Sequence, residues 1–169
     1  MSNADKSFFC GIDPGKTGGL SLIRDDGDFE ASFKMPLLTS KDLDINKIYS
    51  ILEKYKIKFL AIEKAQAFPG QGVCSMFNYG KNYGILLSII SILKIPYIEV
   101  NPHIWIRRLV GLNKMLSSKK RKDRKKEIKN NIKLFIIKRF PIISSKTLSE
   151  GEVDATAIAE FARLYFIQK

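Results

Sequence analysis

Three acidic residues lie where an α/β protein places its chemistry. Asp13 ends the apolar run 8–13, and Glu63 ends the apolar run 58–63; both runs are typical of buried strands. Asp154 follows much later, in the first turns of an expected C-terminal helix. Ligands of open α/β sheets bind beyond the carboxyl ends of the strands, so the first two carboxylates are expected at one edge of the sheet. The three acids are candidate metal ligands and catalytic residues.

A carboxylate cluster of this kind suits the hydrolysis of a phosphodiester. The reaction needs an activated water and stabilisation of the attacking and leaving oxygens, and two divalent ions about 3.5–4 Å apart supply both. We expect Mg²⁺ as the cofactor, with Mn²⁺ as the alternative, because both prefer carboxylate oxygens. The structural alternatives are that Asp13 forms a turn or a helix cap and that Glu63, which precedes Lys64, is exposed to solvent.

The fourth carboxylate is expected close to Asp154. Glu150 is four residues before Asp154 and shares its helix face, whereas Glu152 points elsewhere. Both glutamates also match a capping box, in the patterns Ser149-x-x-Glu152 and Thr147-x-x-Glu150. Glu150 is the preferred fourth ligand, and the capping alternative stays open.

The apolar pattern predicts the elements that position these acids. Strands are expected over 8–13, 18–23, 29–34, 58–63 and 96–100, with an Asp-Gly turn after the second. Helices are expected over 44–55, 76–93, 102–109, 123–140 and 149–166, with loops over 65–75 and 111–121. Three antiparallel strands followed by β-α units indicate an α/β fold with a mixed sheet flanked by helices. We assign one domain to residues 5–169, because residues 1–4 look like the remnant of an expression tag.

Two features of the helices bear on packing. Gly80 and Gly84 are four residues apart in the helix 76–93 and give it a small-residue face that allows close packing. Trp105 is expected in the core or at an interface, rather than as a platform for a nucleobase.

Composition indicates a polyanionic partner. The chain has 29 basic and 17 acidic residues, for a net charge of +12, which suits nucleic acid or an anionic membrane surface. No apolar run approaches the roughly 20 residues that span a bilayer, and no secretion signal is seen at the N-terminus. With only two isolated cysteines, a reduced protein of the cytoplasm (associated with the nucleoid) or of an organellar matrix is expected, neither secreted nor bound to a membrane.

A basic segment precedes and enters the helix 123–140. Seven of the eight residues 119–126 are basic, and the candidates for DNA binding are Lys119, Lys120, Arg121, Lys122 and Lys126. One helix face carries Lys122, Lys126, Lys129 and Lys133, and the opposite side carries Ile128, Ile132, Phe135, Ile136 and Phe140. The apolar side would anchor the helix and display its charge to phosphates, which give affinity without sequence choice. The alternative is a solvated run of charge.

The loop after Glu63 provides further DNA-binding candidates. Phe68 could wedge or stack in an opened DNA structure, and Gln66 and Gln71 could read base edges. The alternative is a plain connection with Phe68 in the core. Lys16 and Lys64 are adjacent to the acids and could contact the scissile phosphate, with ordinary exposed lysines as the alternative.

Three motifs that contain the acids follow one another along the chain. They are Gly11-Ile12-Asp13-Pro14-Gly15 with Gly18-Gly19, then Ala61-Ile62-Glu63-Lys64, then Asp154-Ala155-Thr156-Ala157-Ile158-Ala159. This ordered set resembles the RuvC-type Holliday junction resolvases of the RNase H-like superfamily over roughly residues 8–165. The segment 63–83 is most similar to the chloroplast and related bacterial branch of that family.

The resemblance implies an RNase H-like fold and a homodimeric endonuclease that nicks two opposed strands of a four-way DNA junction. Asp13, Glu63 and Asp154 would be the metal ligands, and the helix 76–93 would form the dimer core. In one respect the chain departs from the bacterial pattern, which pairs two acids three residues apart on the last helix: the residue three before Asp154 is Gly151. Glu150 would substitute, as in the chloroplast branch.

Two other functions remain open at this stage. One is an RNase H-like nuclease that acts on another branched substrate or on an RNA–DNA hybrid. The other is a non-catalytic DNA-binding protein that uses only the basic face.

Overall fold

The computed structural model describes residues 6–66, 70, 72–111 and 121–168, and for Arg121 and Lys122 it describes the backbone alone. It has one sheet of five strands in the order β3-β2-β1-β4-β5. The first three strands are antiparallel, whereas β4 and β5 run parallel to β1. The strand bounds are β1 Phe8–Asp13, β2 Gly19–Arg24, β3 Phe29–Lys34, β4 Ile57–Glu63 and β5 Tyr97–Val100. The expected mixed sheet is confirmed.

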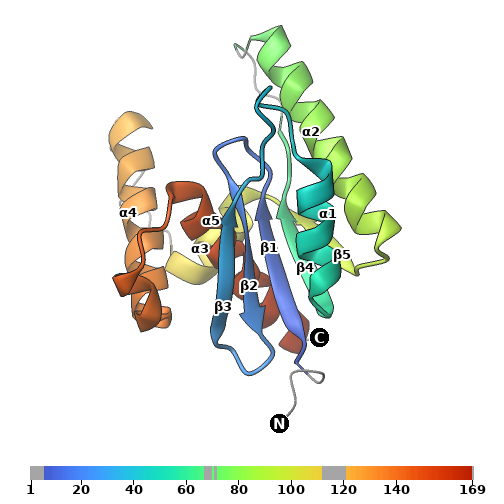
Figure 1. Ribbon diagram of the computed structural model, residues 1–169. Helices are drawn as coiled ribbons and strands as arrows, with labels where there is room; N and C mark the ends of the chain where they lie inside the picture. The colour runs from blue at the N-terminus through green and yellow to red at the C-terminus, as the bar shows by residue number, and fades with distance from the viewer. Residues whose placement is uncertain (1–5, 67–69, 71, 112–120, 169) are drawn as a thin grey trace.

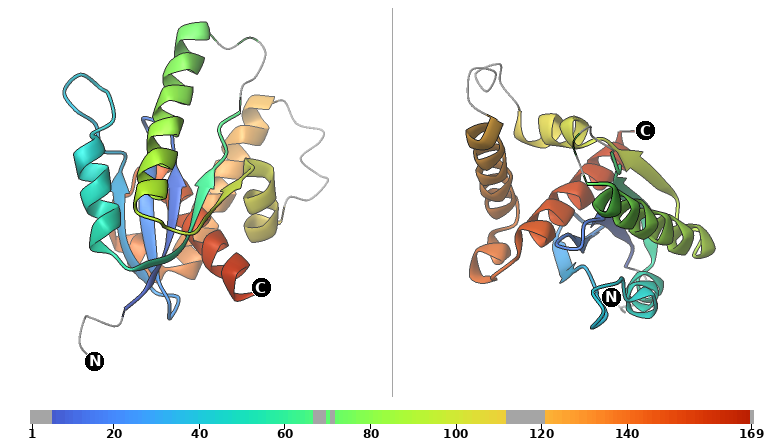
Figure 2. Two further views of the ribbon diagram at one scale, coloured as in Figure 1. Left: turned by 90° about the vertical axis from the view of Figure 1, so that its right-hand side faces the viewer. Right: turned by 90° about the horizontal axis from the view of Figure 1, so that it is seen from above.

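Helices cover both faces of this sheet (Figures 1 and 2). One face carries α1 and α2, and the other carries α5, with α3 and α4 packed around it. The helix bounds are α1 Ile45–Lys54, α2 Val73–Ile92, α3 Pro102–Val110, α4 Arg121–Arg139 and α5 Glu150–Ile167, with a 3₁₀ helix η3 at Pro141–Ser145. None of the described helices is both long and apolar enough to cross a bilayer.

Two predicted helix boundaries were wrong by a few residues. α2 begins at Val73, directly after the extended Gly72, so the predicted loop 65–75 is shorter than expected. α4 begins at Arg121, two residues earlier than predicted, so residues 121–126 of the basic segment are helical. Most of the predicted loop 111–121 lies outside the described residues.

The alternation of side chains along β1 and β4 sets which face each acid occupies. Cys10 and Ile12 of β1 and Leu60 and Ile62 of β4, all even-numbered, are buried against α1 and α2. Odd-numbered residues face α5: Phe9 and Phe59 both contact the ring of Phe166. Asp13 and Glu63 belong to the odd-numbered sets, so both carboxylates belong to the α5 face.

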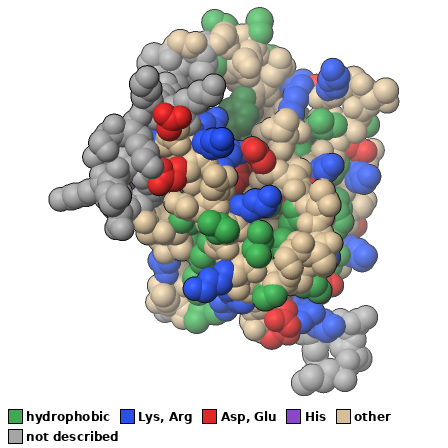
Figure 3. Space-filling model, turned by 90° about the vertical axis from the view of Figure 1, so that its left-hand side faces the viewer, with side chains coloured by type: hydrophobic (Ala, Val, Ile, Leu, Met, Phe, Trp, Pro, Cys, Tyr) green, Lys and Arg blue, Asp and Glu red, His purple; other side chains and the backbone are tan. Residues whose placement is uncertain are grey.

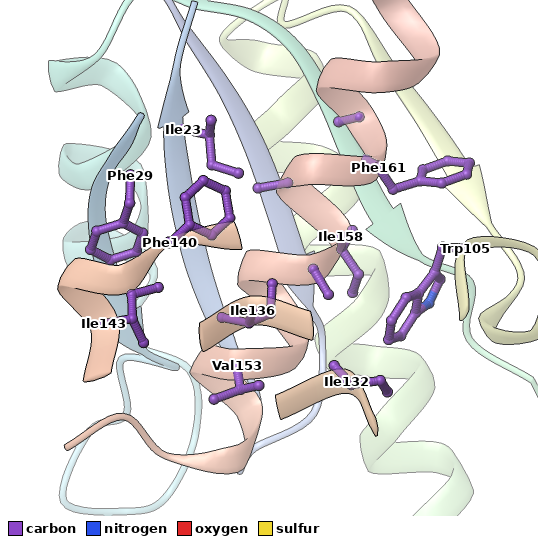
Figure 4. Packing of buried hydrophobic residues seen from close by; sticks show 14 of the residues in the cluster. Ile23, Phe29, Trp105, Ile132, Ile136, Phe140, Ile143, Val153, Ile158 and Phe161 are labelled. Atoms are coloured by element: carbon purple, nitrogen blue, oxygen red, sulfur yellow. The ribbon is translucent and has the colours of Figure 1, made fainter. Parts of the chain in front are cut away.

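α4 is anchored by its apolar side. Ile132, Ile136 and Phe140 are buried, and Ile128 and Phe135 pack against the same cluster. Figure 4 shows Ile132 and Ile136 of α4, and Phe140 directly after it, among residues of α5 and the sheet. The predicted amphipathic pattern is confirmed, and it fixes which lysines of α4 can approach the sheet edge.

Candidate active site

Asp13 and Glu63 end two neighbouring parallel strands. Ile12 of β1 pairs with Ile62 of β4, so the next residue of each strand is an acid at the same edge of the sheet. This edge lies at the upper end of the sheet in Figure 1. The Asp13 carboxylate accepts a hydrogen bond of 3.3 Å from the Gly15 backbone N–H, which orients it at the start of the β1–β2 turn.

Glycines let α5 approach this edge unusually closely. A Cβ atom at Gly11 would overlap the backbone of Ala155 and Ala159, and one at Gly151 would overlap the backbone of Thr17 and Gly18. The first turns of α5 are therefore in direct backbone contact with β1 and the β1–β2 turn. This contact brings Asp154 to the two strand-end acids.

The charges of the three acids act on one another. Burial raises the pKa of Glu63 to about 7. The negative charges of Asp13 and Asp154 also raise this pKa, whereas the hydrogen bond that Trp105 donates lowers it. Burial also raises the pKa of Asp154 to about 6, and Asp13 adds to that effect. The pKa of Asp13 is raised by burial as well. Like-charged carboxylates in a partly desolvated site are stabilised by a cation.

Lys129 of α4 supplies such a cation. Its Nζ lies 2.5 Å from Glu150 Oε2 and 3.7 Å from Asp154 Oδ2. Burial alone would lower the pKa of Lys129, but the hydrogen bond that its ammonium donates to Glu150 and the charges of Asp154 and Asp13 raise it. Sequence reasoning placed Lys129 on a solvent-facing basic face and missed its contact with the acids.

The two candidates for the fourth carboxylate have different surroundings. Glu152 is 7% exposed and forms the capping box, since its carboxylate accepts from the Ser149 N–H and hydroxyl and from the Ser32 hydroxyl. The side chain of Glu150 is 79% exposed and is joined to Asp154 through Lys129. The capping alternative thus applies to Glu152, and the Thr147-x-x-Glu150 box is wrong.

Two aromatic residues complete the surroundings of Glu63. Trp105, buried as expected, donates from its indole Nε1 to Glu63 Oε2 at 3.0 Å. Tyr79 of α2 has its pKa raised to about 12 by burial and by the charges of Glu63 and Asp13, so its hydroxyl stays protonated near the acids. Sequence spacing did not reveal the hydrogen bond of Trp105, because it joins α3 to β4 across 42 residues of the chain.

A cleft of about 770 Å³ opens beside Glu63. Three predicted DNA-binding residues line it, namely Lys16, Lys64 and Gln66. Gln66 also donates to the Asn101 side chain at 2.7 Å. On the side that carries α4, basic and acidic side chains lie next to one another around a hollow (Figure 3).

Residues not foreseen from the sequence also line the cleft. They include Lys125 of α4 and Asn82 of α2, whose buried side-chain oxygen has no hydrogen-bond partner among the described residues. The apolar positions Ile128 and Ile132 could have marked Lys125 and Lys129 as the lysines nearest the surface that the helix covers, but not which groups they contact.

The remaining DNA-binding candidates are placed only in part. Lys126 is exposed on α4. The backbone of Arg121 and Lys122 belongs to the first turn of α4, and their side chains are not described. Phe68, Gln71, Lys119 and Lys120 lie outside the described residues.

The donor set fits Mg²⁺ or Mn²⁺ by its chemistry, since it consists of hard carboxylate oxygens balanced by one ammonium group. As the side chains stand, no three His, Cys, Asp or Glu residues in the described ranges enclose a metal position. Glu63 is turned towards Trp105 and Asp154 towards Lys129. Asp13, Glu63 and Asp154 would hold the ion, with Glu150 beside them.

The sheet order and the flanking helices define an RNase H-like fold of the RuvC type. The chain is similar to the solved structure of Thermus thermophilus RuvC in complex with a Holliday junction substrate, with a TM-score of 0.69, 15% identity and 96% of each chain covered. A second Thermus thermophilus RuvC structure has a TM-score of 0.65 at the same identity and coverage. No protein-family model matches the sequence, and no curated protein matches it. The expected fold is confirmed by these structures.

Proposed function

We propose that the protein is a metal-dependent endonuclease that resolves four-way DNA junctions. The observation that carries this proposal is the group of three coupled carboxylates at one sheet edge, beside a cleft lined by lysines. The likeness to a RuvC structure solved with its junction substrate supports the choice of substrate.

In this proposal Asp13, Glu63 and Asp154 hold divalent ions, which would supply an activated water and stabilise the leaving oxygen. Trp105 orients the Glu63 carboxylate through its indole N–H. Lys16 and Lys64 would bind phosphates on either side of the scissile bond, because both line the cleft that contains Glu63.

A homodimer is part of the proposal, because two opposed nicks require two active sites. An apolar stripe runs along the exposed side of α2 and comprises Val73, Phe77, Gly80 and Gly84 at helical spacing. Val73 is 84% and Phe77 72% exposed, and neither glycine has a described atom close to where its Cβ would lie. The small-residue face predicted to pack closely therefore contacts nothing described within its own chain, which suits packing against a second copy.

A cleavage assay tests the activity. Purified protein is incubated with a labelled four-way junction, a matched duplex and an RNA–DNA hybrid, in Mg²⁺ or in EDTA. We expect paired, symmetrical nicks in the junction alone, and only with metal. Asp13→Asn should abolish them, whereas Asp28→Asn, at an exposed carboxylate of the β2–β3 hairpin, should retain them.

Three other outcomes would each contradict a different part of the proposal. Cleavage that survives Asp13→Asn would exclude the assigned site. Preferred cleavage of the hybrid would support the other nuclease function, and junction binding without cleavage in any divalent metal would support the non-catalytic one.

The dimer is tested by light scattering after size exclusion. Phe77→Glu should convert a dimer into a monomer, because it places a charge in the centre of the stripe. Ile142→Glu alters an exposed apolar residue of η3, away from α2, and should leave the dimer intact. A monomeric wild-type protein would contradict the proposed assembly.

A further inference from the structure

Lys129 places an ammonium group among the proposed metal ligands. It forms an ion pair with Glu150 and lies 3.7 Å from Asp154. Its charge also acts on Asp13 and Glu63. The charge of Lys129 therefore acts on all four carboxylates, which divalent ions would neutralise in the proposed metal site.

The position of Lys129 follows from the packing of α4. The neighbouring turn inserts Ile132 into the core, which holds the backbone of Lys129 beside the start of α5. The lysine side chain is only 34% exposed, whereas that of Glu150 is 79% exposed. A fixed backbone and a flexible four-carbon stem let the ammonium reach the acids or turn away from them.

A divalent ion and this ammonium cannot both sit beside Asp154 at low cost. Two positive charges a few ångströms apart repel each other strongly in a partly desolvated site. Lys129 must therefore move before Asp154 can serve as a metal ligand. In the DNA-free protein, it competes with the metal.

The cleft offers Lys129 another partner when DNA is bound. Lys125, one helical turn earlier on α4, already lines the cleft together with Lys16 and Lys64. A phosphate bound by these lysines would lie within the same basic zone and would attract the Lys129 ammonium as a point charge.

We propose that Lys129 couples DNA binding to metal loading: it neutralises the acids in the free protein and transfers to a DNA phosphate in the complex. The metal site then binds tightly only when DNA is present. By linkage, metal and DNA strengthen each other's binding. This inference rests on the proposed function for the identity of the metal and of the DNA.

Mn²⁺ binding to the full-length protein without DNA provides the first test. Free Mn²⁺ is counted by electron paramagnetic resonance, with Asp154→Asn to identify binding at this site. We expect Lys129→Gln to bind Mn²⁺ about tenfold more tightly than the wild type. Lys129→Arg retains the charge and should bind as weakly as the wild type. Lys138→Gln removes one exposed charge from the last turn of the same helix and should also match the wild type.

The second test adds a four-way junction with hydrolysis-resistant linkages at its centre. DNA should strengthen Mn²⁺ binding by about tenfold in the wild type and by much less in Lys129→Gln, whose site is already free. Equal gains in the two proteins would overturn the coupling.

Two results without DNA would also overturn it. One is unchanged or weaker Mn²⁺ binding by Lys129→Gln, and the other is an equal gain in Lys138→Gln, which would reveal a general effect of charge. These measurements do not depend on cleavage. If the protein cleaves no junction, the proposed function is refuted. The Mn²⁺ measurements would still decide whether Lys129 competes with the metal.

Discussion

Glu63→Gln should stabilise the metal-free fold at alkaline pH while it abolishes cleavage. The pKa of Glu63 is raised from 4.5 to about 7, chiefly by burial and then by Asp13. A carboxyl group with a higher pKa in the folded state binds more protons when folded. The free energy of unfolding therefore falls as pH rises from about 4.5 to about 7, and stays level above that.

The size of the effect follows from the same two pKa values. At about 1.4 kcal/mol for each pKa unit, ionised Glu63 costs the fold at most about 3.5 kcal/mol. Partial exposure of the side chain reduces this to about 1–2 kcal/mol. Glutamine removes the charge and keeps an oxygen that can accept from Trp105 Nε1, so the variant should gain most of that amount at pH 8.

Urea denaturation in EDTA measures the difference. Glu63→Gln should be about 1–2 kcal/mol more stable than the wild type at pH 8 and less than about 1 kcal/mol more stable at pH 5, where wild-type Glu63 is already protonated. Glu53→Gln makes the same chemical change at an exposed position of α1 and should have little effect at either pH. Equal or lower stability of Glu63→Gln at pH 8 would refute the account of the site as mutually repelling buried carboxylates.

Four further substitutions test the surrounding contacts. Gly151→Ala should lower the unfolding free energy by several kcal/mol, because the added Cβ would overlap the backbone of the β1–β2 turn; a melting temperature close to wild type would contradict this. Glu152→Gln should cost up to about 1 kcal/mol through the weakened cap and retain cleavage, whereas Glu150→Gln should leave the melting temperature unchanged and lower kcat at least about tenfold. Trp105→Phe removes the hydrogen bond that lowers the pKa of Glu63, so the acidic limb of the pH–rate profile should move to higher pH; an unmoved limb would count against this role.

The positions of the strand-end acids could be predicted because they depend on local patterns. An apolar run that ends in an acid identifies both a strand and its carboxyl edge, and the alternation of side chains then puts Asp13 and Glu63 on one face. The same reasoning separated Glu150 from Glu152, because a capping glutamate and a residue four before Asp154 point in different directions. The spacing of apolar residues and the capping pattern are properties of a single helix or strand, so the sequence alone reveals them.

The contacts of Lys129 and Trp105 could not be predicted in this way. Each depends on how one helix packs against another element: Lys129 on α4 against α5, and Trp105 on α3 against β4. The sequence identified one helix face of lysines, but the rotation of α4 relative to the acids depends on the depth to which Ile132 and Ile136 are buried. That depth is set by the whole core.

The close contact between α5 and the β1–β2 turn also gives a physical reason for the unusual spacing of the acids on α5. Gly151 stands three residues before Asp154, where the bacterial resolvases have an acid, and no side chain fits there because even a Cβ would overlap the backbone of Thr17. An acid at that position would require α5 to move away from the turn. That movement would also carry Asp154 away from Asp13, whose negative charge raises the pKa of Asp154 in the present arrangement. An acid at position 150 avoids the conflict, because its side chain leaves the helix on the solvent side and still reaches the Lys129 ammonium that contacts Asp154. The four-residue spacing is thus a consequence of how tightly this helix packs, and it leaves Glu150 joined to Asp154 through Lys129 of α4.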